Sequence, residues 1–375
     1  MAGAERGRAD EGAPDFTALG VLVGHATDEP GGTGCTVILG ARGPMRGAAA
    51  LVGRAGGTRE LAVLEPSSLA DRVDAVLLTG GSAYGLDAAA GVMRWCEERG
   101  RGFDVGAGVV PIVPAAVLFD LLPCGRFDAR PTPAMAYEAC ERAVASGIAE
   151  GSIGAGTGAT VGKALGVEWA MKGGVGCAVV RGGGATAGAV AVTNAFGDVR
   201  DESGRIVAGA RTAQGGYADA LRVLADASAP VDGSLRNTTL AVVVVDVPLG
   251  RVALAQLARA ASAGLHRRIT PAGTTFDGDV VFALCPFVEA GAGGPPGVQD
   301  TPPTAAPRHP FTSHRIDALP VPRAAHPAPV DDPAALVRLE ALAADALARA
   351  VERGVRRARG RDGVPGLADG GAPAR

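Results

Sequence analysis

The segment NTTLAVVVVD, residues 237–246, decides how the chain folds. Eight apolar or β-branched residues in a row, starting at Thr238, precede Asp246. A continuous run of this kind is typical of a strand that is buried on both faces, in contrast to the alternating pattern of a half-exposed strand. The sequence therefore predicts that this strand lies inside a layered core.

A long polar segment ends where this strand begins. Residues 198–236 are polar and show little periodicity, which predicts a long surface linker that stops at Asn237. A cut between Asn237 and Thr238 would leave Thr238 as a new N-terminus anchored in the core. Its free α-amine, with a reference pKa of about 8, could serve as general base for its own hydroxyl. The alternative is that Thr238 only starts a strand, because β-branched residues are common there.

Strands and helices surround this segment without strict alternation, which favours an α+β layered sandwich over a doubly wound sheet. Short apolar runs bounded by glycine predict strands, and amphipathic stretches predict helices. The predicted strands cover residues 35–40, 48–53, 74–81, 176–182, 188–197 and 279–287. The predicted helices cover residues 84–98, 133–146, 251–268 and 333–358.

The ends of the chain and one internal stretch differ from this core. Polar residues 1–15 predict a disordered leader, and residues 359–375 predict a disordered tail. Residues 290–332 are rich in Pro, Ala and Gly, which predicts an extended insertion within a single domain of residues 16–358.

The composition is that of an ordinary globular chain, with 375 residues, 47% hydrophobic, 20% charged and a net charge of -3. This charge gives no reason to expect nucleic acid as a partner. The 57 glycines and 4% aromatics predict many tight turns and a core of Ala, Val and Leu. The six cysteines lack any C-x-x-C spacing, so we expect reduced thiols, no metal and no cofactor. With no apolar leader and no run of about 20 apolar residues, we expect no membrane contact and a cytoplasmic protein.

The most glycine-rich segment is GSIGAGTGATVGK, residues 151–163. It fails as a P-loop, because its last glycines stand one residue too close together and Ala164 replaces the Ser or Thr. It also fails as a dinucleotide-binding G-x-G-x-x-G fingerprint. Two interpretations remain: a flexible turn, or a loop whose backbone amides at Gly156, Thr157 and Gly158 approach a substrate or an oxyanion.

Two carboxylates, Asp277 and Asp279, flank one glycine in FDGDVVFA. At strand periodicity they point to the same side, and two carboxylates on one face repel unless a cation is near or one holds a proton. They are either solvent-facing turn acids or part of a site that orients a nucleophile. Asn194, in VTNAFGD, has two interpretations as well: it ends a strand by turn formation, or its amide donates to a developing oxyanion.

Together these segments resemble the P1 family of peptidases, peptidase family S58. That family includes L-aminopeptidase/D-amidase-esterases, β-peptidyl aminopeptidases and 6-aminohexanoate-oligomer endohydrolases. The blocks that carry the resemblance, between about Gly20 and Pro286, are VGHATD, LLTGGSAYGLDAAAGV, VPIVPAAVLFDL, GAGTGATVGK, MKGGVG, AVTNAFGDV, NTTLAVVVVD and FDGDVVFAL. Many separate blocks in the right order are more specific than any single motif.

The resemblance implies a four-layer αββα fold of the self-cleaving N-terminal-nucleophile type. It also implies cleavage after Asn237 into an α chain of residues 1–237 and a β chain of residues 238–375. The Asp-Gly-Asp sequence resembles the nylon-oligomer branch of the family. In that branch the family's site roles fall on Lys163, Asn194, Thr238, Asp277 and Asp279.

In the implied mechanism, Thr238 first attacks the carbonyl of Asn237 and later attacks a substrate amide. The α-amine or Asp277 takes the proton. Asp279 and Lys163 hold the network, and the positive charge of Lys163 is expected to keep both aspartates ionised.

Asn194 and the amides of the glycine-rich segment stabilise the oxyanion in this scheme. Some relatives use a Tyr near the PIVPAAV block, where the nearest residue here is Phe119, which cannot donate a side-chain hydrogen bond. The implied activity is amide hydrolysis of a small peptide or amide substrate, by an aminopeptidase or oligoamide hydrolase that forms a homo-oligomer, a tetramer of αβ units. Two alternatives remain: acyl transfer like that of ornithine acetyltransferases, and a non-catalytic ligand-binding module.

Overall fold

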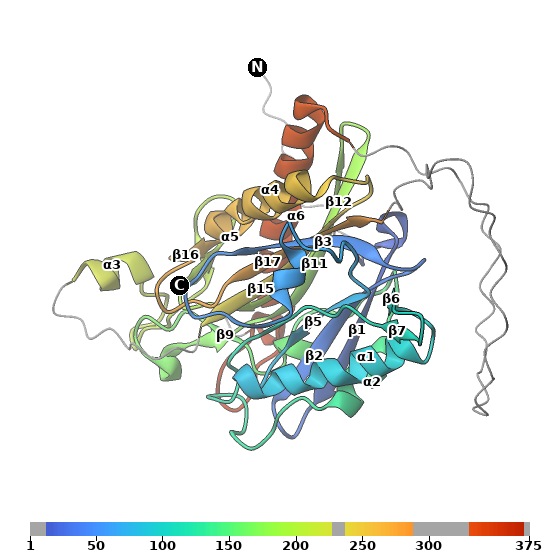
Figure 1. Ribbon diagram of the computed structural model, residues 1–375. Helices are drawn as coiled ribbons and strands as arrows, with labels where there is room; N and C mark the ends of the chain where they lie inside the picture. The colour runs from blue at the N-terminus through green and yellow to red at the C-terminus, as the bar shows by residue number, and fades with distance from the viewer. Residues whose placement is uncertain (1–12, 227–236, 288–329, 371–375) are drawn as a thin grey trace, which may run out of the picture. The chain divides into compact units, whose positions relative to one another are not determined.

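The computed structural model of the chain describes residues 13–226, 237–287 and 330–370 (Figure 1). Residues 1–12, 288–329 and 371–375 lie outside the described residues, and with them most of the expected leader and insertion and the end of the tail. The predictions made for these stretches therefore stay predictions.

Two five-stranded sheets form the centre, with strand orders β1-β2-β5-β8-β4 and β11-β12-β15-β17-β3. The first sheet contains β1 (Val21–Asp28), β2 (Thr33–Gly40), β4 (Gly57–Arg59), β5 (Ala75–Thr79) and β8 (Ala115–Val117). The second contains β3 (Met45–Leu51), β11 (Gly174–Gly182), β12 (Ala185–Asn194), β15 (Thr238–Val245) and β17 (Val280–Pro286). Both sheets are mixed, since β5 runs parallel to β8 and β15 runs parallel to β17 while the other neighbours are antiparallel.

Helices cover the outer faces of both sheets. The helices are α1 (Ala89–Glu97), α2 (Pro133–Glu141), α3 (Ala220–Ala225), α4 (Arg251–Ala261), α5 (Ala263–Arg268) and α6 (Pro333–Arg356). Figure 1 shows α1 and α2 on one side of the two sheets and α4, α5 and α6 on the other. None of the helices in the described ranges is long and apolar enough to cross a membrane.

Three buried clusters correspond to the three interfaces between the four layers. Leu77 of the first sheet and Val92 of α1 belong to the outer cluster on that side. Ile38 and Phe282, one from each sheet, belong to the cluster between the sheets. Leu347 of α6 belongs to the third cluster, under α4, α5 and α6. The predicted four-layer αββα sandwich is confirmed.

β15 is the fully buried strand that the sequence predicts, with every residue buried. Successive side chains of a strand point to opposite faces. Val242 accordingly joins the cluster between the sheets, and Val243 joins the cluster under the helices. Both faces of β15 therefore need apolar side chains, which explains the continuous run.

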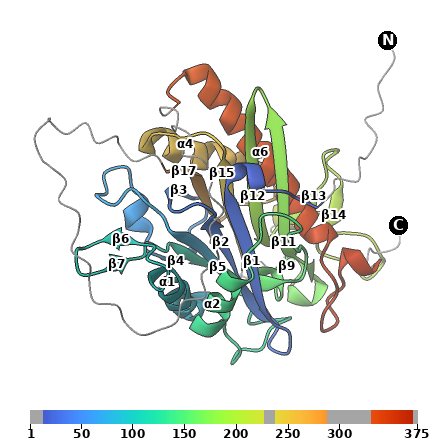
Figure 2. The same ribbon diagram turned by 90° about the vertical axis from the view of Figure 1, so that its right-hand side faces the viewer.

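α6 lies beside the hairpin of β11 and β12 (Figure 2). Its start is set by Pro333 at the first position and by Asp332, whose carboxylate accepts from the amide of Ala335 at 3.0 Å. Gly176 of β11 allows the close approach, because a Cβ there would lie 2.0 Å from the carbonyl oxygen of Ala350. The small residues at this interface therefore allow α6 and β11 to lie close together.

The predicted helix at residues 84–98 begins instead as a 3-10 helix, Ser82–Ala88, and becomes α-helical only in α1. Gly85 gives the reason for this difference. A Cβ at this position would lie 1.9 Å from the carbonyl oxygen of Gly80, so the backbone here packs directly against the preceding strand end.

Two other predicted helices are also interrupted by contacts that the sequence does not reveal. The helix predicted at 133–146 stops at the end of α2, because Val144 exchanges two backbone hydrogen bonds with Val23 of β1. The helix predicted at 251–268 divides at Ser262 into α4 and α5. The Ser262 hydroxyl donates to the carbonyl three residues earlier, which competes with the regular helical hydrogen bond.

The surface linker predicted over residues 198–236 is wrong for its first part, where the chain folds into short strands and α3. The buried carboxylate of Asp198 accepts from the amides of Ala210 at 3.2 Å and Ala220 at 2.7 Å, which ties these turns together. The rest of the segment lies outside the described residues. The small strands are β6 (Phe103–Asp104), β7 (Val109–Val110), β9 (Thr160–Val161), β10 (Met171–Lys172), β13 (Asp198–Arg200), β14 (Ile206–Ala208) and β16 (Ile269–Thr270).

Residues 359–370 differ from the disordered tail that the composition predicts. Arg361 forms an ion pair with Glu29 at 3.0 Å. The carbonyl oxygen of Pro365 accepts from the backbone amide of Lys172 at 2.9 Å. These contacts join the end of the described chain to segments far away in the sequence, so local composition could not indicate them.

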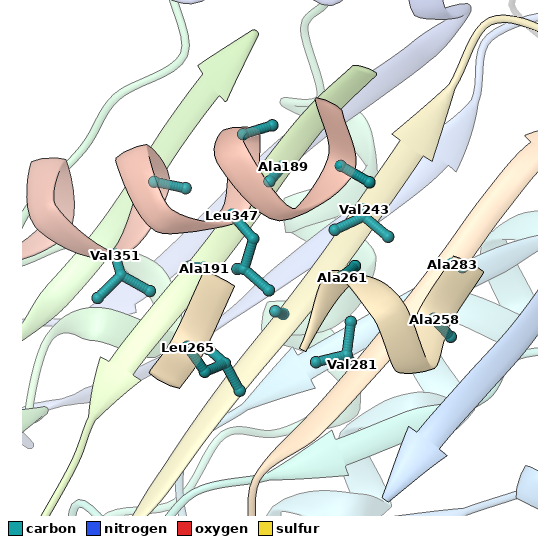
Figure 3. Close-up of a cluster of buried hydrophobic side chains, with 14 of the residues drawn as sticks. Ala189, Ala191, Val243, Ala258, Ala261, Leu265, Val281, Ala283, Leu347 and Val351 are labelled. Carbon is teal, nitrogen blue, oxygen red and sulfur yellow. The ribbon is translucent and has the colours of Figure 1, made fainter. Parts of the chain in front are cut away.

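Leu347 tests the packing of α6 onto the second sheet. Its side chain is fully buried among strand and helix residues (Figure 3). We expect Leu347→Ala to lower the free energy of unfolding by about 2–5 kcal/mol, because it leaves a cavity in a closely packed layer. The matched control is Val337→Ala on the same helix, where the side chain is 63% exposed and the change should stay within about 0.5 kcal/mol. Urea denaturation measures both, and equal losses would contradict the assigned buried face.

Candidate active site

Thr238 is held at the start of β15 between two neighbouring strands. Asn194 is its partner in the antiparallel pairing with β12. On the other side Asn237 bridges to Asp277, and the parallel register of β15 with β17 places Gly278 opposite Thr238. The site therefore lies in one row across the second sheet, with Thr238 in its middle.

The peptide carbonyl of Asn237 receives two hydrogen bonds. The Thr238 hydroxyl oxygen Oγ1 donates to it at 2.5 Å, and the backbone amide of Gly278 donates to it at 2.8 Å. Asn237 and Thr238 are 4% and 5% exposed, so both groups are shielded from water. A hydroxyl oxygen therefore lies next to the peptide bond that a cut would break, and an N–H donor is already bound to the oxygen of that carbonyl.

Gly278 is a glycine because the site leaves no space for a side chain there. A Cβ at this position would lie 2.7 Å from Thr238 Oγ1 and 2.8 Å from the carbonyl oxygen of Ala55. Gly53 packs in the same way, since a Cβ there would lie 2.0 Å from the carbonyl oxygen of Asp277. The segment around residues 53–55 therefore forms one wall of the site.

Asp277 and Asp279 are 1% and 2% exposed, so the interpretation as solvent-facing turn acids is wrong. Asp279 accepts from the amide of Thr239 at 2.5 Å and from the amide of Gly273 at 3.0 Å. Asp277 accepts from the amide of Thr274 at 2.8 Å. The two carboxylates are thus bound by successive amides of one turn, which agrees with the prediction that they point to the same side.

Asp279 does not titrate like an ordinary aspartate. Burial, followed by the nearby charge of Asp277, raises the pKa of Asp279 to about 7. The amides of Thr239 and Gly273 oppose this rise, and the charge of Lys163 opposes it less than they do. The expected effect of Lys163, which is to keep both aspartates ionised, is therefore outweighed at Asp279 by burial and by the charge of Asp277.

Lys163 and Asn194 are brought together as the resemblance implies. The Lys163 ammonium donates to both the backbone carbonyl oxygen and the side-chain Oδ1 of Asn194, each at 3.1 Å. Asn194 Oδ1 also accepts from the amide of Thr160 at 2.9 Å, and Asn194 Nδ2 donates to the carbonyl oxygen of Phe119 at 3.0 Å. The orientation of the Asn194 amide is therefore fixed, and Phe119 takes part through its backbone rather than its ring.

The glycine-rich segment is a buried turn with its own hydrogen bonds. The amide of Gly156 donates to the carbonyl of Ile153 at 2.9 Å, and the amide of Thr157 donates to the carbonyl of Gly154 at 3.2 Å. Gly158 packs close to the backbone of Gly32, whose carbonyl oxygen would lie 2.3 Å from a Cβ. Two of the three amides proposed to approach a substrate are thus occupied within the turn.

The sequence interpretation assigned no role to Lys172 and Asp120, which the structure buries near this turn. Lys172 donates to the carbonyl oxygens of Thr157 and Ala159, both at 2.7 Å. Asp120 accepts from the hydroxyl of Thr33 at 2.6 Å. Both residues lie within the sequence blocks MKGGVG and VLFDL, so the blocks themselves were the available signal.

The fold and this site together define a class of protein. A strand-initial threonine whose hydroxyl contacts the preceding carbonyl, inside an αββα sandwich, is the arrangement of N-terminal-nucleophile amide hydrolases. The same site holds buried carboxylates and a side-chain amide, which are group types that such chemistry can use for proton transfer and hydrogen-bond donation.

Sequence comparison identifies the family: the chain belongs to peptidase family S58, whose family model matches residues 18–367. The chain is 40% identical over 345 residues to a protein of Mycobacterium tuberculosis (strain ATCC 25618 / H37Rv) named as an uncharacterized aminopeptidase, covering 90% of this chain and 89% of the relative. It is 35% identical over 284 residues to the 6-aminohexanoate-oligomer endohydrolase of Kocuria sp. (strain KY2), covering 72% and 74%.

Solved structures agree with the fold. A β-aminopeptidase of Burkholderia sp. superposes with a TM-score of 0.63 at 21% identity, covering 95% of this chain and 92% of that chain. The L-aminopeptidase D-Ala-esterase/amidase of Ochrobactrum anthropi, described as a variant of the Ntn hydrolase fold, gives a TM-score of 0.61 at 20% identity, covering 92% and 88%. The chain therefore has the Ntn hydrolase fold and, by its family, is a hydrolase of peptide or amide bonds. Acyl transfer and a non-catalytic binding module are not favoured.

The raised pKa of Asp279 predicts a pH effect on stability. Its folded pKa of about 7 lies above the value of about 3.9 for an unfolded aspartate. The folded chain binds more protons than the unfolded chain between these values, so this carboxyl lowers the free energy of unfolding as pH rises through that window. We expect Asp279→Asn, relative to its parent, to be more stable at pH 8 than at pH 5. Urea denaturation of the two proteins at both pH values measures this difference.

The parent for this comparison carries Thr238→Ala, so that the polypeptide stays in one piece and a single unfolding transition can be measured. Asp128→Asn is the control, because its carboxylate is 82% exposed. A pH-dependent gain of the same size in the Asp128 variant would show that the effect does not come from burial at the site.

Proposed function

We propose that the chain cleaves itself between Asn237 and Thr238, and that the exposed Thr238 then hydrolyses amide bonds through an acyl-enzyme. The observation that carries this proposal is the shared carbonyl oxygen of Asn237, which accepts from the Thr238 hydroxyl at 2.5 Å and from the Gly278 amide at 2.8 Å. The first contact keeps a nucleophile next to the carbonyl, whose carbon it attacks once its proton has turned toward a base. The second supplies a donor for the charge that develops on the oxygen.

In the first stage, Thr238 Oγ1 bonds to the carbonyl carbon of Asn237 and its proton passes to a base. The C–N bond then breaks, the nitrogen of Thr238 takes a proton and becomes a free amine, and an ester joins the two chains. Water hydrolyses this ester, giving a carboxylate on Asn237 and restoring the hydroxyl. The Gly278 amide stabilises the oxyanion of each tetrahedral intermediate.

In the second stage, Thr238 attacks a substrate amide in the same way. Its own α-amine or Asp277 takes the hydroxyl proton and returns it to the leaving amine. Asp279 and Lys163 hold the network, since Asp279 binds the amide that follows the nucleophile and Lys163 binds Asn194. Asn194 contributes to oxyanion stabilisation, and the chain that follows the glycine-rich turn at residues 156–158 holds its side chain through the amide of Thr160.

The substrate that we propose is a small peptide or an oligoamide. One relative is named as an aminopeptidase and another as a 6-aminohexanoate-oligomer endohydrolase, and the Asp277–Asp279 pair supports the second group. A panel of aminoacyl p-nitroanilides beside a 6-aminohexanoate oligomer separates the two activities. Hydrolysis of neither class would contradict the proposed substrates.

We also propose a cytoplasmic homo-oligomer, a tetramer of αβ units. All six cysteines are buried and free, which is usual in a reducing compartment. Leu69 and Val252 are 90% and 74% exposed, and Arg251 joins their segments by donating to the carbonyl of Leu69 at 3.3 Å. Contiguous exposed apolar groups mark interaction surfaces, so we place a subunit contact at these two segments. A light-scattering mass of one αβ unit at all concentrations would contradict the assembly.

Self-cleavage is tested directly by denaturing electrophoresis and N-terminal sequencing. In proportion to 37.2 kDa for 375 residues, we expect pieces of about 23.5 and about 13.7 kDa, for 237 and 138 residues. The smaller piece should begin at Thr238. An active enzyme that remains uncut, or a smaller piece with another first residue, would contradict the proposal.

Substitution of Thr238 separates the nucleophile from the strand start. Thr238→Ala should give an uncut and inactive chain that still folds, because the strand keeps its apolar residues and loses only the hydroxyl and a methyl group. Thr238→Ser should keep some cleavage, because the hydroxyl survives. Full activity of the Ala variant would show that Thr238 is only a strand residue.

Asp277 is expected to act in both stages. We expect Asp277→Ala to slow self-cleavage and turnover each by about 10²-fold or more, the usual scale for loss of a general base or of the group that orients it. Asp277→Asn keeps the shape and loses the charge, so its turnover should resemble that of the Ala variant with less damage to folding. Precursor half-life and turnover measure the two stages. Unchanged rates in both variants would leave Thr238 with its own α-amine as the base.

A further inference from the structure

Lys172 is a buried lysine that has no role in the proposed mechanism. It is fully buried, and its ammonium donates to the carbonyl oxygens of Thr157 and Ala159 at 2.7 Å each. Its backbone pairs with Thr160 across the two short strands β9 and β10. One side chain therefore holds both ends of the three-residue segment 157–159, directly before Thr160.

Asp120 packs beside the middle residue of this segment. It is fully buried and accepts from the hydroxyl of Thr33 at 2.6 Å and from the amide of Gly81 at 2.7 Å. Gly158 packs against it, since a Cβ at Gly158 would lie 2.7 Å from Asp120 Cβ. Burial raises the pKa of Asp120 to about 6 and lowers the pKa of Lys172 to about 8, and the attraction between their opposite charges opposes both shifts.

Both anchored segments end at the side chain of Asn194. The amide of Thr160, which follows the segment held by Lys172, donates to Asn194 Oδ1 at 2.9 Å. The carbonyl of Phe119, which precedes Asp120, accepts from Asn194 Nδ2 at 3.0 Å. The oxygen and the nitrogen of the Asn194 side chain are therefore each bound by a backbone stretch that contacts Lys172 or contains Asp120.

The backbone before Asn194 is held close to the same lysine. A Cβ at Gly173, the residue after Lys172, would lie 1.9 Å from the carbonyl oxygen of Thr193. The amide of Gly173 also donates to the carbonyl of Ala159 at 2.8 Å. The Lys-Gly pair thus joins the segment 157–159 to the end of β12, where Asn194 lies.

We propose that Lys172 and Asp120 are positioning residues that fix the side-chain amide of Asn194 relative to Thr238. This inference rests on the proposed role of Asn194 in oxyanion stabilisation. Burying an ammonium and a carboxylate is unfavourable, because both groups lose their solvation. Apolar side chains of similar size would fill the same space without this cost. The contacts of Lys172 and Asp120 are explained if the Asn194 amide must be held to within a fraction of an ångström to act as a donor.

The first experiment measures steady-state kinetics of Lys172→Met and Asp120→Asn. Met keeps most of the length of Lys and removes the donors, and Asn keeps the shape of Asp and removes its charge. We expect kcat to fall by about 10-fold to about 10²-fold with KM changed less than about 3-fold, because a misplaced donor weakens transition-state binding more than substrate binding. The precursor half-life is measured in parallel. A kcat within about 2-fold of the parent in both variants would overturn the proposal.

A second experiment shows whether Lys172 acts through Asn194. The activity of Lys172→Met/Asn194→Ala is compared with that of each single variant. If Lys172 only positions Asn194, the double variant should be no slower than Asn194→Ala alone, whereas independent roles would multiply. Multiplied losses would overturn the proposal. A normal rate in Asn194→Ala alone would instead contradict the proposed function, so the two failures can be told apart.

Arg353→Met is the matched control for loss of a buried charge. Arg353 pairs with Glu150 at 2.5 Å between α6 and the segment before the glycine-rich turn, and both side chains are largely buried. We expect this variant to lower the melting temperature while kcat stays within about 2-fold, because it breaks a buried ion pair away from Asn194. Thr33→Val is a milder change, because it removes only the hydroxyl bound to Asp120. A lower kcat with unchanged KM in this variant would support the same conclusion. An equal fall of kcat in Arg353→Met would overturn it.

Discussion

The register of β15 between its two neighbours is the constraint on which the site depends. Antiparallel pairing with β12 sets Asn194 beside Thr238, and the parallel register with β17 sets Gly278 on its other side. A shift of one residue would turn the Thr238 side chain to the opposite face of the sheet. The apolar run that buries β15 on both faces therefore also determines which groups meet the first residue of the strand.

The acid pair connects this register to proton transfer. Burying Asp277 and Asp279 is unfavourable unless polar groups compensate, and the amides of Thr239, Gly273 and Thr274 do so. The same hydrogen bonds join the start of β15 to the turn before β17. Burial, followed by the charge of Asp277, raises the pKa of Asp279, so this carboxyl holds a proton more readily than an ordinary aspartate. A pair in this state can accept a proton from a hydroxyl and later supply one to a leaving amine, as amide hydrolysis requires.

The features that the sequence predicted correctly are those that depend on local pattern or on the family resemblance. The buried strand at Thr238 follows from its continuous apolar run, and the shared direction of Asp277 and Asp279 follows from strand periodicity. The end of α2 was not predictable, because a backbone bridge from Val144 to a distant strand stops the helix. Lys172 was missed for the same reason: nothing near it in the sequence indicates that the carbonyls of a turn converge on its ammonium. Long-range contacts decided these features, and single-sequence periodicity carries no information about them.

Burial of the uncut junction has a consequence for the order of events in the proposed mechanism. Asn237 and Thr238 are almost inaccessible, and the carbonyl of Asn237 already occupies the Gly278 amide. A substrate carbonyl needs this same position beside the Thr238 hydroxyl, so it can enter only after Asn237 has moved away. Cleavage then does two things at once, because it creates the α-amine that serves as a base and it frees the donor that had held the chain's own peptide. In the proposed mechanism the uncut chain is inactive because its own peptide occupies the site, and the substrate later uses the same geometry that favours self-cleavage.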